Sequence, residues 1–385
     1  MEYIALKDIA KITMGQSPDS SSYNENGEGL PFYQGNADFG ELYPNERVWC
    51  NAPKKVAKPN DILISVRAPI GALNYAKDKC CIGRGLAAIT VEDDAERNYI
   101  FHLLKAKNAD LNKQGTGSTF KAIGRNILEE LKVPQISQDE KQRCMHLMDL
   151  LESIIRGRKL QLTTLDQLVK ARFIEMFGDT EKNTNCFEEM KLGDICDLQN
   201  GYAFKSEDYV DFSTVNNCRM SNIRPNGGFD SEYSPKYLPD AFWDKYENYR
   251  LCDGDVIIAM TDMASDPKIL GVPTIVKSDG KRFLLNQRVG KLMFAEENQF
   301  NRVFLMRFLS QSYIRMNLAK KAGGSTQINV GKPAILDINI LRPSIESQNQ
   351  FADFVKQVDK SKVAVQAALD EAQLLFDSLM QQYFG

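Results

Sequence analysis

The chain has 385 residues, of which 43% are hydrophobic and 26% charged, and its formal net charge is −3. This length exceeds one ordinary domain, so several domains are expected, and the balance of residue types excludes long disordered tails. A negative net charge argues, taken alone, against a general nucleic-acid binder.

No stretch reaches the roughly 18 uninterrupted apolar residues that a membrane span needs, and MEYIALKDIA at the N-terminus has no signal-peptide pattern. We therefore expect a cytoplasmic protein with no membrane partner. The eight cysteines form no CxxC pair, and the two histidines, His102 and His146, stand at no zinc spacing. We expect reduced thiols and no metal site.

The first globular part opens with LKDIAKITMG at residues 6–15. Apolar runs at 62–66 and 86–91 predict buried strands, and the spacing within 98–107 predicts an amphipathic helix with a basic polar face. The loop GTGSTFKAIG follows at 115–124. Between residues 97 and 128, six cations accompany one carboxylate, Asp110, which indicates a locally basic surface.

The same landmarks return in the second half. LGDICDLQNG at 192–201 matches 6–15, DGDVIIAM at 253–260 matches PNDILISV at 59–66, and AGGSTQINVG at 322–331 matches GTGSTFKAIG. Arg288 is matched with Arg84, strands are expected at 256–260 and 290–294, and a basic helix is expected at 302–317. Offsets that rise slowly predict a tandem duplication of one domain of about 190 residues.

Each copy ends in a proline-free stretch of about forty residues with apolar positions at a 3–4 spacing. These positions are Leu147, Leu151, Ile154, Leu162, Leu165, Leu168 and Arg172 in the first stretch, and Phe354, Val358, Ser361, Val365, Ala368, Ala372, Leu375 and Leu379 in the second. The spacing predicts two long helices that pack on each other. The alternative is that each helix folds back on its own globular half.

The expected fold is α+β. Two homologous α/β domains, at residues 1–136 and 181–343, are joined by two long antiparallel coiled-coil helices, at 137–180 and 344–385, with pseudo-twofold symmetry.

The sequence contains few of the motifs that catalysis requires. The Gly-Ser-Thr loops lack the lysine of a Walker A motif, so each is either a tight turn or a contact to a nucleic-acid phosphate. No G-x-S-x-G elbow and no acidic cluster common to both halves is present. An unrecognised hydrolase would have to gather Cys80, Cys81 or His102 in one cleft, and the second half offers no counterpart.

The repeated L-x-x-I-x-x-I-x-x-G pattern, the Gly-Asp-Val-Ile strand, the Asn-Gln-Arg at 286–288 and the Gly-Ser-Thr before a final strand resemble the specificity subunit of a type I restriction-modification system. The first half departs from this pattern, since PNDILIS lacks the glycine before Asp61 and IGR replaces NQR.

The resemblance implies two target-recognition domains that read the halves of a bipartite, asymmetric double-stranded DNA target. It implies helices that set the spacing and dock two modification subunits, and a chain with no catalytic residue or cofactor of its own. S-adenosylmethionine would be bound by the modification subunits, and ATP and Mg by restriction subunits. The alternative is a non-catalytic coiled-coil adaptor whose duplicated domains bind proteins.

Within this interpretation, cations and hydroxyls near the two loops are candidates for DNA phosphates, and long polar side chains in other loops are candidates for base edges. The phosphate candidates are Lys105, Lys113, Ser118, Thr119, Lys121, Arg125, Arg315, Lys320, Lys321, Ser325 and Thr326. The base-edge candidates are Gln34, Asn36, Arg67, Arg219, Asn222, Arg224 and Gln327. The alternative for each is an ordinary solvated surface residue.

Overall fold

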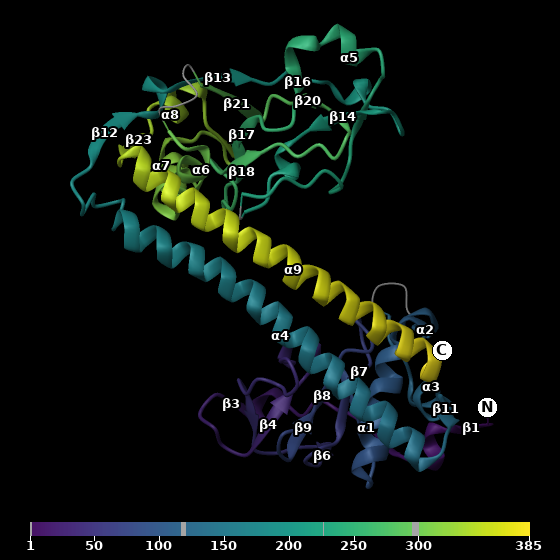
Figure 1. Cartoon of the computed structure of the whole chain (residues 1–385). Coiled ribbons are helices and arrows are strands. Elements are labelled where there is room, and N and C mark those ends of the chain that lie inside the picture. Colours follow the sequence, from purple (N-terminus) through teal and green to yellow (C-terminus); the bar gives the residue numbers. More distant parts are fainter. Residues whose placement is uncertain (1, 117–120, 226, 295–299) are drawn as a thin grey trace. The chain divides into compact units, whose positions relative to one another are not determined.

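The computed structural model describes residues 2–116, 121–225, 227–294 and 300–385 (Figure 1). Contacts divide the chain into two compact units, one of Met1–Gln161 with Ala364–Gly385 and one of Leu162–Val363. Two helices of 40 residues each, α4 (Gln138–Phe177) and α9 (Ile345–Phe384), contribute to both units. The predicted domain limits at 136, 180 and 343 stay predictions.

The first unit is built on a four-stranded antiparallel sheet in the order β2 (Lys11–Met14), β10 (Leu86–Thr90), β7 (Ile62–Ser65), β8 (Leu73–Tyr75). A five-stranded sheet has the order β3 (Tyr23–Asn24), β5 (Trp49–Cys50), β4 (Leu30–Tyr33), β9 (Cys80–Ile82), β6 (Val56–Ala57), and β1 (Glu2–Ala5) pairs with β11 (Lys132–Gln135). The helices are α1 (Asp94–Ala106), α2 (Asn108–Gln114) and α3 (Arg125–Glu129). The strands predicted at 62–66 and 86–91 are therefore confirmed as β7 and β10.

The second unit repeats this plan. Its central sheet has the order β13 (Cys196–Asn200), β21 (Val289–Phe294), β17 (Val256–Ala259), β19 (Pro273–Ile275), and a second sheet has the order β15 (Tyr237–Leu238), β14 (Val215–Cys218), β20 (Arg282–Leu285), β16 (Arg250–Leu251). Two further pairs are β12 (Glu188–Lys191) with β23 (Asn339–Arg342) and β18 (Thr261–Met263) with β22 (Gln327–Asn329). The helices are α5 (Phe242–Lys245), α6 (Arg302–Leu309), α7 (Ser312–Lys321) and α8 (Lys332–Leu336).

One predicted helix is divided. The segment expected as a single helix at 302–317 ends as α6 at Leu309 and restarts as α7 at Ser312. Ser310 donates its hydroxyl to the Met306 carbonyl at 2.7 Å, and Gln311 takes an extended backbone conformation before α7. A hydroxyl that competes for the helix carbonyls in this way favours termination. The first unit has the same pair of consecutive helices, α1 and α2.

The central sheets, with the same strand order in both units, confirm the duplication predicted from the sequence, with one correction. The Gly15 amide bonds to the Leu86 carbonyl at 2.9 Å, and the Gly201 amide bonds to the Val289 carbonyl at 3.3 Å, so Leu86 corresponds to Val289. Counting back one and two residues, Arg288 corresponds to Gly85 and Gln287 corresponds to Arg84. The sequence match of Arg84 with Arg288 was wrong by one position, because similarity of residue type cannot place a gap inside a short turn.

Gly201 lies against the neighbouring backbone with no room for a side chain. A Cβ there would stand 2.1 Å from the Asn286 carbonyl oxygen. We expect Gly201→Ala to lower the free energy of unfolding by about 3 kcal/mol through forced displacement of the backbone. Denaturant unfolding checks this against Gly323→Ala, where a Cβ meets nothing within 4 Å. Equal destabilisation by the two changes would contradict the steric explanation.

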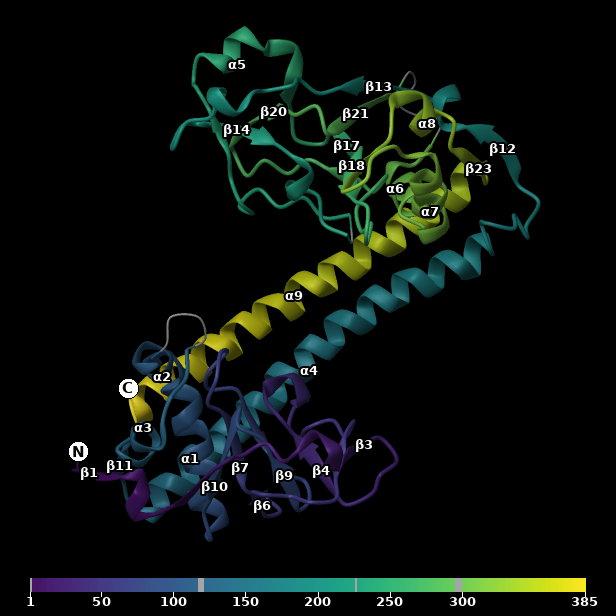
Figure 2. The same cartoon turned by 180° about the vertical axis from the view of Figure 1, so that it is seen from behind.

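Within each unit the two long helices lie side by side, as both views show (Figure 1, Figure 2). In the second unit Lys362 pairs with Asp166 at 2.5 Å, and Arg172 stands over the ring of Phe354 at 5.7 Å. Residue numbers rise along α4 as they fall along α9, so the helices are antiparallel, as predicted. Both helices also pack on the globular part of each unit. The alternative prediction, in which each helix folds back on its own globular half, is therefore correct in part.

On α9 the buried positions agree with the predicted ones in part, and Phe376 is buried in place of Leu375. Val358, Val365 and Ala372 are buried as expected, whereas Leu375 is 52% exposed and its neighbour Phe376 is 5% exposed. Phe376 contacts the globular part of the first unit, because its ring lies 6.4 Å from that of His102. The same displacement occurs on α4, where Leu147, Ile154 and Leu168 are exposed while Met148 and Ile155 are buried. In the first unit the buried face of each long helix therefore includes positions that contact the globular part as well as the other helix.

Candidate nucleic-acid interface

Four segments of the first domain meet where β7 and β9 end and β10 begins. The Gly85 amide bonds to the Gln34 carbonyl at 3.1 Å, the Val66 amide bonds to the Gly85 carbonyl at 2.9 Å, and the Ala68 amide bonds to the Lys121 carbonyl at 3.0 Å. We name the resulting set the first polar edge: Gln34, Asn36, Arg67, Arg84 and Lys121.

Side chains of the first polar edge are available to a ligand. Gln34, Arg67, Arg84 and Lys121 are exposed, and Asn36 is half-buried. Among the described residues, no carboxylate forms an ion pair with any of the three cations. Three of the sequence candidates for base contacts therefore converge with one phosphate candidate. Arg84 was missed, although its position between Gly83 and Gly85, a pattern typical of an exposed turn, could have marked it.

The second domain has an equivalent edge with different side chains. Gln287 and Arg288 are exposed at the start of β21, and Gln327 is half-buried on β22. We name these three residues the second polar edge.

Arg219 also lies here, in the place of Gln34. It follows Cys218, whose carbonyl accepts from the Asn286 amide at 3.1 Å, as Gln34 follows Tyr33, whose carbonyl accepts from the Gly83 amide at 2.8 Å. With Arg219 the second domain has two cations in this place, where the first polar edge has three.

Backbone pairing shows why the two edges differ in charge. Arg67 bridges to Ala122 and Thr261 pairs with Asn329, so Thr261 occupies the place of Arg67. Thr261 is 1% exposed and donates its hydroxyl to Asn329 Oδ1 at 2.5 Å. The residue before Asn329 is Ile328, which takes the place of Lys121 and is buried.

The remaining base-edge candidates of the second domain, Arg219, Asn222 and Arg224, form a loop cluster that begins at this edge. Asn222 is 4% exposed, donates to the Asp230 carbonyl at 2.8 Å and accepts from the Arg219 amide at 2.9 Å. Arg224 bonds through Nε to Asp230 at 3.0 Å and stands over the Tyr233 ring at 3.9 Å. Hydrogen bonding from Arg224 lowers the pKa of Asp230. The amide of Asn222 is thus used to shape the loop.

Most of the phosphate candidates have protein partners. The ion pairs are Lys105 with Glu152 at 2.5 Å, Lys113 with Asp110 at 3.5 Å, Arg125 with Glu129 at 2.7 Å and Lys321 with Asp337 at 2.7 Å. Lys320 reaches Asn317 at 3.4 Å, and Arg315 donates to the Lys268 carbonyl at 3.3 Å. Hydrogen bonds from Lys191 and Lys321 lower the pKa of Asp337 to about 2. Their roles in DNA binding stay predictions.

The second Gly-Ser-Thr loop is a tight turn. Gly323 and Asn329 bridge across it, Gly324 has φ +123°, and the Thr326 carbonyl accepts from Ala264 at 3.0 Å. Ser325 and Thr326 are exposed there. Ser118 and Thr119, in the first loop, lie outside the described residues.

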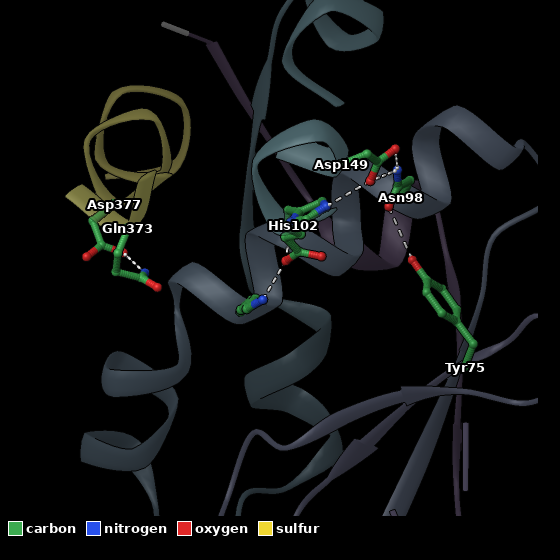
Figure 3. A network of polar contacts seen from close by, with 8 residues as sticks. Tyr75, Asn98, His102, Asp149, Gln373 and Asp377 are labelled. Atoms are coloured by element: carbon green, nitrogen blue, oxygen red, sulfur yellow. Dashed lines mark hydrogen bonds and ion pairs between the residues drawn. The ribbon is translucent and has the colours of Figure 1, made fainter. Parts of the chain in front are cut away.

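The residues required by a hydrolase are not gathered. Cys80 and Cys81 are buried on β9, and burial raises the pKa of the two thiols to about 12 and about 11, which keeps them protonated and poorly nucleophilic. His102 is buried on α1 and faces Asp149 and Glu152 of α4, at 3.8 and 3.9 Å (Figure 3). No group of three metal-ligating side chains occurs in the described part of the chain.

The His102 surroundings hold α1 against α4. Asn98 donates to both carboxylate oxygens of Asp149, at 3.3 and 3.2 Å, and accepts from the Tyr75 hydroxyl at 3.4 Å (Figure 3). Lys105 completes the row through Glu152 and stands 5.1 Å from the Phe376 ring. Lys105, predicted as a phosphate contact, therefore takes part in the packing of α1 against the two long helices.

Asp149 makes the stability of this junction pH-dependent. Interaction with His102, followed by the Asn98 hydrogen bonds, lowers the pKa of Asp149. A lowered carboxylate pKa gives stability that is present above the unfolded-state value of about 3.9 and is lost as the pH falls through the folded-state value. We expect the unfolding free energy of Asp149→Asn to depend less on pH between about 5 and 3 than that of the wild type. Denaturation across this range, with Asp78→Asn as an exposed control, measures the difference.

Helices of the described residues include none that is both long and apolar enough to span a membrane.

Comparison with known proteins agrees with the duplicated fold. The family model of the type I restriction modification DNA specificity domain matches residues 1–164 and 185–372. Over 161 residues the chain is 41% identical to a protein of Methanocaldococcus jannaschii named as the specificity subunit of type I restriction enzyme MjaX, covering 42% of this chain and 38% of that protein. Over 276 residues it is 25% identical to the type I restriction enzyme MjaVIII specificity subunit of the same organism, covering 68% and 63%.

The alignments thus span less than two thirds of either curated relative. The crystal structure of a type I restriction-modification system S subunit from M. genitalium is 13% identical, with a TM-score of 0.58 over 100% of this chain and 96% of that one, which shows a shared fold. Specificity subunits are the non-catalytic recognition chains of such systems, in agreement with the expected absence of an enzymatic role. Because the family model covers most of the chain in two separate matches, the chain belongs to the family of type I restriction-modification specificity subunits, with the DNA specificity domain present twice.

Proposed function

We propose that each recognition domain reads one half of a bipartite, asymmetric DNA target, and that the two long helices set the distance between the halves. The observation that carries this proposal is the pair of polar edges. They occupy the same place in two copies of one sheet, and they present different side chains, with Arg67, Arg84 and Lys121 in the first copy. Equivalent surfaces with unlike side chains are what the reading of two unlike half-sequences requires.

The helices also dock modification subunits in this proposal. On α4, in the first unit, Leu147, Leu150 and Ile154 are 41%, 49% and 38% exposed and lie on one face at helical spacing. An exposed apolar stripe on a helix is typical of a surface that packs on another helix. The modification subunits would carry S-adenosylmethionine and restriction subunits would carry ATP and Mg, all in the cytoplasm, where the host DNA lies.

Methylation mapping of the complex reconstituted from this chain and its modification subunits tests the proposal. The expected result is a methylated motif with two different half-sequences separated by a fixed number of unspecified base pairs. A short continuous motif would contradict it. The same exposed stripe fits the alternative of a protein-binding adaptor, which predicts no sequence-dependent retention of DNA by the assembled complex.

A further inference from the structure

The backbone of Arg84 is held in one place by the turn that carries it. The Gly83 amide bonds to the Tyr33 carbonyl at 2.8 Å, and the Arg84 amide bonds to the Ser17 hydroxyl at 3.2 Å. A Cβ at Gly85 would stand 2.4 Å from the Gln34 carbonyl oxygen, so the turn is packed directly on the neighbouring chain. The base of the Arg84 side chain is therefore preorganised, while its guanidinium group is exposed.

Arg67 follows the end of β7, next to the turn that carries Arg84. Leu86 of β10 faces Ser65 of β7, and the Val66 amide bonds to the Gly85 carbonyl at 2.9 Å. Arg67 and Arg84 each lie one residue beyond this hydrogen bond, where β7 and β10 stop pairing and Arg67 bridges to Ala122. No carboxylate of the described residues pairs with either of these cations. A ligand with hydrogen-bond acceptors would supply the partners that both guanidinium groups lack among the described residues of this edge.

The difference between the two domains indicates which acceptors these are. Every half-site presents the same phosphates, so phosphate contacts would be needed equally in both copies. The second domain instead has Gln287 in the place of Arg84 and the buried Thr261 in the place of Arg67. A position whose side chain changes while its backbone setting is kept is suited to bases, which differ between half-sites.

Among the bases, guanine fits arginine. Guanine presents two acceptors, O6 and N7, in the major groove, and a guanidinium group can donate to both at once, whereas glutamine is suited to adenine. Resting on the proposed function, we infer that Arg84, with Arg67 beside it, reads a guanine in the half-site bound by the first domain.

The experiment uses the reconstituted methyltransferase complex and a duplex carrying its mapped target. Arg84→Ala is expected to weaken binding of this duplex by about 5- to 150-fold while leaving binding of unrelated duplexes within about twofold. Replacement of one guanine of that half-site by 7-deazaguanine, which lacks the N7 acceptor, should weaken wild-type binding and leave the variant nearly unaffected. The matched control is Lys79→Ala, which removes an exposed cation from the opposite end of β9 and should change neither result.

Arg84→Gln introduces the residue found at this place in the second domain and keeps the inference testable if alanine disturbs the turn. It should shift the methylated motif from guanine toward adenine at that position. An equal loss of affinity on all sequences, with a shallower salt dependence, would identify a phosphate contact and overturn the inference. A first half-site without guanine would also overturn it. Absence of any sequence preference in the wild-type complex would instead refute the proposed function, and this inference with it.

Discussion

Replacement of Phe351 by alanine is expected to lower the unfolding free energy of the second unit by about 3 to 5 kcal/mol. Phe351 is fully buried near the start of α9, with ring centroids 5.4 Å from Phe173 and 5.7 Å from Phe177 of α4. Phe304 of α6 joins the same cluster, 4.7 Å from Phe177. Truncation would leave a cavity where two helices and the globular part meet, and the surrounding rings can fill it only partially.

Denaturant unfolding followed by near-ultraviolet circular dichroism measures this loss, because the signal reports on the packed aromatic rings. Val363→Ala is the matched control on the same helix, since Val363 is 71% exposed, and it should change stability by less than about 0.5 kcal/mol. If both variants lost the same stability, the aromatic cluster would not be what holds the helices to this unit.

Lengthening both long helices by seven residues is expected to increase the preferred spacing between half-sites by about three base pairs. Seven residues add about 10 Å of helix and preserve the alternating 3–4 pattern of contacts, so the helices still face each other. The Asp166–Lys362 pair sets the antiparallel register and places Gly157 level with Glu371. The insertions therefore belong between residues 157 and 158 and between residues 370 and 371.

Methylation mapping of the lengthened complex gives the spacing directly. The control carries the seven residues in α4 alone, which takes the two helices out of register and should abolish specific methylation. An unchanged spacing in the doubly lengthened protein would show that partner subunits, and not these helices, set the distance.

Much of the architecture is readable from the sequence because it follows from repeated local patterns. The landmarks at 6–15 and 192–201 predict a duplicated domain, and the central sheets have the same strand order in both units. The two proline-free stretches predict long antiparallel helices. The division of the 302–317 helix was missed, because a hydroxyl returning to the backbone at Ser310 leaves little trace in an apolar pattern.

The candidate site is less predictable, because it depends on charge partners that are distant in the sequence. Basic residues near the Gly-Ser-Thr loops looked alike in the sequence. In the structure, Lys105 and Lys321 are paired with Glu152 and Asp337, whereas Arg67 is left without a carboxylate partner among the described residues. A count of cations along a segment cannot distinguish these two cases.

The sequence by itself determined that one α+β domain is present twice, that each copy is followed by a long helix, and that the chain resembles a recognition subunit without catalytic residues. These conclusions need only periodicity and order along the chain. The tertiary structure decided which face of each helix is buried, and it joined Gln34, Arg67, Arg84 and Lys121 on one edge while giving the matching edge Gln287 and Arg288. Backbone hydrogen bonds at the first polar edge join residues that are 19 to 53 positions apart in the chain, and no local pattern records which of them will meet.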